Sequence, residues 1–220
     1  MHKRIPNLAL LCAWLAGTGA FGADEPDFDF AYSDGLYATI TLAKRIEKPE
    51  LSGEKSSKLE GIPGFLKELK VRTLWQKEGK ERIKSAPLAV PLLGLTGRNK
   101  DDLARVWQGL LYQTGCHVMS IDSTFSYDFH KVSNLGVAGN VAAEAEAVAK
   151  VIEVFLNLPE AKDKVSEVRL LGTSYGGNVA LCLAKLSKEG KLRFTLGTVL
   201  ALSPPISLRS SAKILDRYYD

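Results

Sequence analysis

Residues 171–178 read LGTSYGGN, and residues 172–176 within them form the pattern Gly-x-Ser-x-Gly. In this pattern a serine stands at the tip of a sharp turn from a strand into a helix, and the two glycines let those elements pack closely. The turn strains the serine backbone and directs its hydroxyl outward, toward the same space as the following N–H groups. The pattern predicts Ser174 as a nucleophile, with a purely structural glycine-rich turn as the alternative.

The flanking segments favour the first interpretation. Residues 165–171 (VSEVRLL) are short, apolar and rich in β-branched side chains, as expected of a buried parallel strand. Residues 178–186 (NVALCLAKL) are apolar almost all round, which suits a helix packed on a sheet, and Gly190 supplies a stop. A strand before the serine and a helix after it are the context that this motif requires.

Strand-like and helix-like segments alternate from residue 87 onward. The expected strands are residues 87–95, 116–121, 165–171 and 197–202. Between them, one helix is expected to begin at Asp101-Asp102 and another near Asn140. Their apolar stripes are Leu103, Val106, Trp107, Leu110 and Leu111 in the first helix, and Val148, Val151, Ile152 and Phe155 in the second.

This alternation predicts an α/β fold with a mainly parallel sheet and helices on both faces. Ligands bind such sheets beyond the carboxyl ends of the strands. Residues 95–97, the long loop 123–139, Ser174 and residues 203–205 all fall at that edge. They form one candidate site.

The chain before residue 65 is expected to lie outside the main fold. Residues 1–22 have the charged start, apolar centre and small residues before the cut of a secretory signal peptide, with an apolar stretch too short to span a bilayer. Residues 23–64 are interpreted as an N-terminal arm, extended over residues 36–46. Residues 66–75 and 81–86 then flank Lys77-Glu78-Gly79 as a hairpin, and residues 65–220 form the domain.

Composition excludes several classes of protein. Lysine and arginine number 29 against 25 acids, and removal of residues 1–22 leaves 27 against 25, so the mature charge is +2. With no concentrated basic patch along the sequence, nucleic-acid or anionic-membrane binding is not expected. Three histidines, one of them in the signal peptide, predict no metal site, and no cofactor is expected. Cys116 and Cys182 are expected as buried thiols rather than a disulfide.

The arrangement resembles the α/β-hydrolase superfamily, and more narrowly the YheT-like esterases and lipases. The residues that carry the likeness are the elbow, Gly94-Leu95-Thr96-Gly97, and Ser203-Pro204-Pro205 followed by Leu208 and a helix-like stretch at 211–215. The resemblance implies Ser174 as nucleophile and an oxyanion hole formed by the backbone N–H groups of Tyr175 and Leu95. It also implies shaping roles for the glycines Gly172, Gly176, Gly177, Gly94 and Gly97.

The chain departs from that family at three places. Leu93 stands where the family has histidine, and residues 122–125 (DSTF) replace an Arg-Gly turn. No histidine follows Ser174, although this fold places the triad in the order Ser, acid, His. The favoured explanation is the N-terminal part of a longer hydrolase, because ending at this strand would leave an apolar sheet edge; the alternative is a complete but degenerate or non-catalytic protein.

Two histidines, His117 and His130, lie within the expected domain. His130 lies in the long loop at the active edge, where it is a candidate substitute base but is more readily interpreted as a surface or lid residue. His117 begins a strand at the opposite edge and is interpreted as structural.

The sequence thus predicts an exported serine hydrolase that cleaves carboxylic esters of small molecules through an acyl-enzyme. Acyl transfer on the same fold and a non-catalytic binding protein are the alternatives.

Overall fold

A six-stranded sheet organises the computed structural model, which describes residues 51–79, 82–211 and 213. Its order is β1-β2-β6-β5-β7-β8. The strands are β1 (Lys55–Leu59), β2 (Leu69–Leu74), β5 (Ala86–Leu92), β6 (His117–Ser120), β7 (Val165–Thr173) and β8 (Leu196–Leu202). The strands β5, β6, β7 and β8 run parallel to one another. The strand β2 pairs antiparallel with β6 on one side and with β1 on the other. The prediction of a mainly parallel sheet is confirmed.

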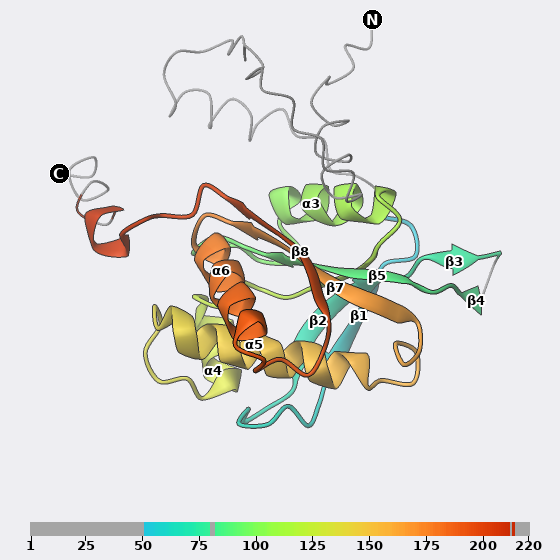
Figure 1. The fold of residues 1–220 in the computed structure, drawn as a ribbon, viewed down its shortest axis with the longest axis horizontal. Coiled ribbons are helices and arrows are strands. Elements are labelled where there is room, and N and C mark those ends of the chain that lie inside the picture. Colours follow the sequence, from blue (N-terminus) through green and yellow to red (C-terminus); the bar gives the residue numbers. More distant parts are fainter. Residues whose placement is uncertain (1–50, 80–81, 212, 214–220) are drawn as a thin grey trace, which may run out of the picture.

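Helices cover both faces of the sheet (Figure 1). The helix α3 (Asp102–Gln113) lies on one face, and α4 (Tyr127–Ser133), α5 (Val141–Leu156) and α6 (Tyr175–Lys188) lie on the other. Each face has its own apolar core, the larger one beneath α5 and α6. The central strand β5 contributes to both cores, which explains its nearly continuous apolar sequence. None of the helices in this described region is long and apolar enough to cross a membrane.

The ends of α5 and α6 follow local signals. The side chain of Asn140 accepts a hydrogen bond from the Ala143 N–H at 3.2 Å and so caps the start of α5. The four predicted stripe residues of α5 are all buried. Beyond α6, Gly190 takes a positive φ of 68°, a conformation that glycine adopts without strain. These predictions are confirmed.

The predicted stripe of α3 is confirmed only in part: Leu111 is buried and Trp107 packs against the smaller core, but other buried positions lie outside the stripe. Leu103 is 50% exposed, whereas the buried positions are Ala104, Gln108, Gly109 and Leu111. The buried face is narrow and partly polar, because Gln108 turns inward to bind the backbone of the preceding loop and the side chain of Ser120. An apolar periodicity count cannot identify a face that is buried through hydrogen bonding.

The region before residue 87 differs from the predicted hairpin. Of the predicted hairpin, the described residues form only a small part, in which the short strand β3 (Lys77–Glu78) pairs with β4 (Arg82–Ile83). The strand β2, expected as one arm of that hairpin, pairs with β1 and β6 instead. The strand β1 lies within the predicted arm, so the sheet begins before residue 65. The predicted loop at 123–139 also contains α4. Residues 1–22 and 36–46 lie outside the described residues.

Candidate active site

Ser174 occupies the single-residue turn between β7 and α6. Its backbone has φ 51° and ψ −122°, a region that non-glycine residues rarely adopt and that costs about 1–3 kcal/mol. The residue is exposed and its side chain does not cap the helix that follows. A strained, exposed serine whose hydroxyl is not used by its own helix has the geometry predicted for a nucleophile.

Close packing requires glycine on either side of this serine. A Cβ atom on Gly172 would lie 2.4 Å from the Gly176 carbonyl oxygen, and one on Gly176 would lie 2.2 Å from the Leu92 carbonyl oxygen. Both contacts are with backbone, which cannot move aside as a flexible side chain can. The spacing Gly-x-Ser-x-Gly is therefore explained by the crossing of α6 over β7 and β5.

The end of β8 and the segment after it hold the elbow from the other side. The Ser174 N–H donates to the Leu202 carbonyl oxygen at 2.8 Å, and the Asn178 amide donates to the Pro205 carbonyl oxygen at 3.2 Å. A Cβ on Gly177 would lie 3.1 Å from the Cβ of Pro204. The structure thus brings residues 203–205 to the site, as predicted from the sheet edge.

The turn at Gly94–Gly97 lies directly beside the serine. A Cβ on Gly94 would lie 3.5 Å from the Ser174 Cβ and 3.9 Å from its Oγ. The Gly97 N–H donates to the Gly94 carbonyl oxygen at 3.2 Å, which closes the turn, and Leu95 at its tip is 39% exposed. The two segments predicted to make an oxyanion hole are therefore neighbours, although the roles of the Leu95 and Tyr175 N–H groups stay predictions.

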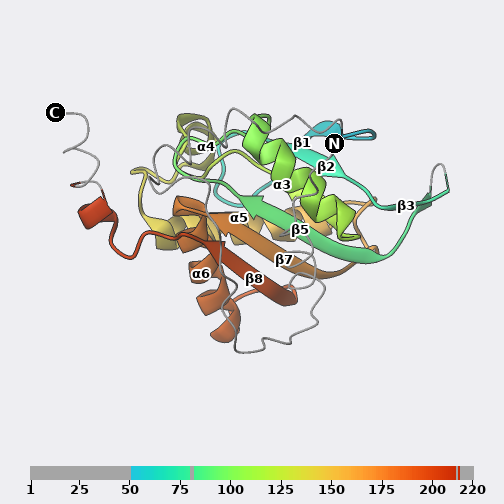
Figure 2. The ribbon, with the colours of Figure 1, turned by 90° about the horizontal axis from the view of Figure 1, so that it is seen from above.

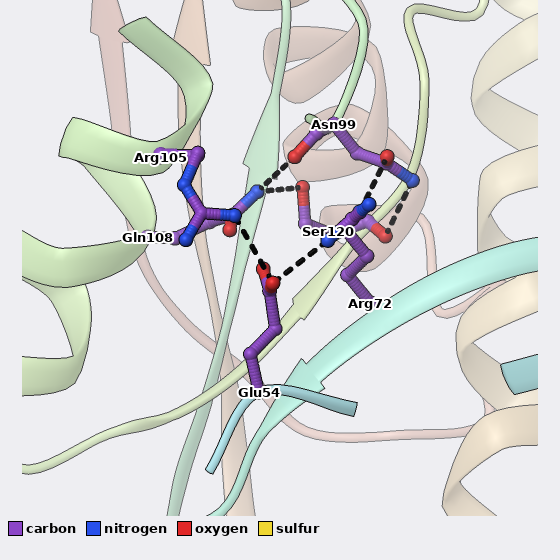
Figure 3. A network of polar contacts seen from close by, with 6 residues as sticks. All are labelled: Glu54, Arg72, Asn99, Arg105, Gln108 and Ser120. Atoms are coloured by element: carbon purple, nitrogen blue, oxygen red, sulfur yellow. Dashed lines mark hydrogen bonds and ion pairs between the residues drawn. The ribbon is translucent and has the colours of Figure 1, made fainter. Parts of the chain in front are cut away.

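A polar network fixes the loop that continues from this turn (Figure 3). Glu54 accepts hydrogen bonds from Arg72 at 2.7 Å and Arg105 at 3.1 Å, which joins β2 to α3. Arg72 also donates to the side-chain oxygen of Asn99 at 3.2 Å, and Gln108 donates to the Asn99 carbonyl oxygen at 2.6 Å. Asn99 itself is only 7% exposed, so the loop is held on both its backbone and its side chain.

A buried carboxylate that the sequence reasoning missed lies beneath the elbow. Glu144 on α5 is fully buried and accepts hydrogen bonds from the Tyr175 hydroxyl at 2.8 Å, the Thr124 hydroxyl at 2.5 Å and the Gly139 N–H at 2.8 Å. It thereby ties the residue after the serine to the 123–139 segment. Burial, followed by the hydrogen bond to Glu144, raises the pKa of the Tyr175 hydroxyl well above its ordinary value of 10.

His130 is not a surface residue, contrary to the prediction. Its side chain is 11% exposed, and its Nε2 lies 3.6 Å from a Glu144 carboxylate oxygen. Both ring nitrogens are buried without a hydrogen-bond partner. His130 lies on α4, within a segment predicted as loop. His130 is thus connected to the elbow through Glu144 and Tyr175.

His117 is held within the fold by hydrogen bonds, and both cysteines are free thiols, of which only Cys116 is buried as predicted. The His117 Nδ1 accepts from the Gln76 N–H at 3.0 Å, and its Nε2 lies 3.2 Å from the Lys164 carbonyl oxygen, which requires the neutral ring. Burial lowers the pKa of His117 accordingly. Cys116 is a buried free thiol and Cys182 a half-buried one whose pKa burial raises. Within the described ranges no group of three metal-ligating side chains occurs.

Comparison with known proteins identifies the fold. No family model matches the chain, and no curated protein matches it. Among solved structures, it is similar to Est1E from Butyrivibrio proteoclasticus (TM-score 0.51, 17% identity, 72% of this chain and 54% of that one). It is also similar to the esterase Pf2001 from Pyrococcus furiosus (TM-score 0.52, 19% identity, 79% and 64%).

A third similar structure is brefeldin A esterase, described as a bacterial homologue of human hormone sensitive lipase (TM-score 0.50, 16% identity, 94% of this chain and 60% of that one). The chain has the α/β-hydrolase fold. It spans between about half and two thirds of the length of these three esterases.

Proposed function

We propose that this protein is a serine hydrolase that cleaves carboxylic esters of small molecules through an acyl-enzyme formed on Ser174. The observation that carries the proposal is the backbone of Ser174, strained at φ 51° and exposed at the start of a helix. A protein retains such strain where the surrounding structure enforces it, and such residues cluster at active sites. The resemblance of the fold to three esterases supports the same class of reaction.

In the proposed reaction, the Ser174 Oγ attacks the acyl carbon and the carbonyl oxygen becomes negatively charged. The backbone N–H groups of Tyr175 and Leu95 would stabilise that oxygen, and each such donor typically contributes about 3 kcal/mol. Collapse breaks the bond to the alcohol, which leaves with the serine proton. Water then attacks the acyl-enzyme and releases the acid.

The serine needs a base, since an unassisted hydroxyl is a poor nucleophile. No histidine follows Ser174 up to residue 220, and His130 is held against Glu144. We propose that an acid and a histidine complete the site in the order Ser, acid, His that this fold uses. The chain spans 54–64% of the length of the three esterases.

The test is labelling of the full-length native protein with a fluorophosphonate probe, followed by peptide mapping. Labelling at Ser174 is expected, and Ser174→Ala should abolish it while leaving the fold intact, because the side chain is small and exposed. Ser187→Ala, at the far end of the same helix, is the matched control and should label normally.

The other outcomes select among the alternatives. An unlabelled native protein would contradict the proposal and favour a non-catalytic binding protein. Labelling without ester hydrolysis, but with transfer to an added alcohol, would indicate an acyltransferase. Assignment to the YheT-like branch and export after removal of residues 1–22 also stay proposals; N-terminal sequencing of the mature protein tests the second.

A further inference from the structure

A recess of about 580 Å³ opens at the same sheet edge as Ser174, on the side of β2 and α4. Six basic residues line it: Lys67, Lys70, Arg72, Arg98, Lys100 and Lys131. They come from β2 and the segment before it, from the loop after β5, and from α4. Three separate parts of the chain thus direct positive charge into one space, which the linear sequence did not reveal.

This charge is not neutralised within the described part of the protein. Arg72 is paired with Glu54, but the other five basic side chains have no ion pair there. Two carboxylates also line the recess, and one of them, Asp122, accepts a hydrogen bond from the Asn99 N–H at 2.7 Å. Five unpaired cations against two carboxylates leave an excess of positive charge in the recess, while residues 23–220 as a whole carry a net charge of only +2.

The walls of the recess are held in place before any ligand arrives. Leu69 and Phe129 line it and are 5% and 0% exposed, so their positions are set by the core. Asn99 and Arg72 also line it and belong to the network of Figure 3. A volume of this size is in the range of small-molecule sites. A recess with fixed walls and a cationic rim fits a small anion better than an extended polymer.

The recess and the serine share one structural element. The loop after β5 places Gly94 against Ser174 and, a few residues later, Arg98 and Lys100 in the recess. In the sheet, β6 and β5 separate β2 from β7, and strands lie about 4.8 Å apart, so the two places are roughly 10–15 Å from each other. Figure 2 shows α4 at the end of the sheet where β5 and β7 finish.

We infer that this recess is a binding site for an anionic group, phosphate or carboxylate, on a small molecule. Resting on the proposed ester hydrolysis, the group belongs to the substrate: the ester carries a negative charge some 10–15 Å from its scissile bond, and the recess selects such esters. The Lys and Arg side chains would attract the ligand from solution and orient it along the loop that also borders the serine.

The first experiment measures binding without catalysis. Isothermal titration of the full-length protein with inorganic pyrophosphate, and separately with citrate, should give one saturable site that weakens with added salt. Lys70→Ala combined with Lys131→Ala should weaken it by about tenfold. Lys185→Ala combined with Lys188→Ala, which removes the same charge from the exposed end of α6, should change it less than about twofold.

The two anions distinguish a site for phosphate groups from a site for carboxylate groups. Binding of pyrophosphate alone assigns a phosphate site, and binding of citrate alone assigns a carboxylate site. Absence of saturable binding for both, or an equal loss in the two double variants, overturns the inference. Circular dichroism and thermal unfolding of each variant verify that the fold is retained.

The second experiment addresses the substrate. The 4-nitrophenyl hemiester of sebacic acid and its neutral methyl ester differ in one remote charge. The Lys70→Ala, Lys131→Ala variant should lower kcat/KM for the charged ester by about tenfold and leave the neutral ester unchanged. An equal change of kcat/KM for both esters in the double variant would contradict the substrate assignment. Loss of fluorophosphonate labelling would instead contradict the hydrolase proposal and leave the titration result standing.

Discussion

Replacing Tyr175 by phenylalanine isolates one hydrogen bond beneath the elbow. The hydroxyl donates to Glu144 at 2.8 Å, and both residues are buried, at 1% and 0% exposure. The ring itself packs edge-on against Phe125 at 5.2 Å, a contact that phenylalanine keeps. Loss of a buried hydrogen bond to a carboxylate costs about 1.5–3 kcal/mol, so Tyr175→Phe should lower the free energy of unfolding by about 2 kcal/mol.

The assay is equilibrium unfolding in urea, with stability obtained from the midpoint at an unchanged slope. Tyr112→Phe is the matched control, because its hydroxyl makes a longer bond of 3.3 Å to the Trp75 carbonyl oxygen in a half-buried position. Its loss should cost less than about 1 kcal/mol. Equal effects of the two variants, or less than about 0.5 kcal/mol for Tyr175→Phe, would refute the reasoning.

The same pair of proteins has an expected pH dependence. Because the folded-state pKa of Tyr175 is raised, the unfolded chain loses this proton first as the pH rises above 10. The contribution of the hydroxyl to stability is therefore fully present below pH 10 and declines above it. The stability difference between the native protein and Tyr175→Phe should shrink between pH 10 and 11.

Three further predictions concern the folding and stability of the protein. Gly176→Ala should abolish soluble folded protein or probe labelling, because its Cβ meets backbone at 2.2 Å, whereas Gly94→Ala should fold, since its nearest contact is 3.5 Å. The folded-state pKa of His117 is lowered, so its contribution to stability is present above pH 6.5 and declines as the pH falls below it; denaturation curves from pH 7.5 to 5.0 should show a steeper loss for the native protein than for His117→Gln. Asn140→Ala removes the cap on α5 and should lower the midpoint of thermal unfolding by the equivalent of about 1 kcal/mol; an unchanged midpoint would show that the Asn140 side chain contributes nothing to the start of α5.

Sequence reasoning located the elbow because its constraints are local. A side chain at either glycine beside Ser174 would collide with backbone a few residues away or on the adjoining strand. The spacing of the glycines in the sequence therefore predicts the close packing of the turn. The stripe of α5 was equally visible, since an entire face of that helix is apolar and buried. In both cases the residues of a single segment are enough to predict its structure.

The missed features depend on partners distant in sequence. Glu144 looks like a solvent-facing acid in an alanine-rich helix, and its donors come from residues 124, 139 and 175. The cations of the recess are scattered between residues 67 and 131. In β1, the sequence KSSKL carries no apolar alternation because four of its five residues are exposed at the sheet edge. Pattern alone does not identify such positions.

The support of the elbow by the end of β8 and the residues after it has a consequence for biosynthesis. The Ser174 N–H is bonded to Leu202, and Asn178 to Pro205, so the turn lacks these restraints until about thirty more residues have been made. At ribosomal rates of about 5–20 residues per second, that interval lasts roughly 1.5–6 s. In a nascent chain the elbow residues are therefore complete before their restraints exist, and the strained turn at Ser174 is secured only once β8 has docked.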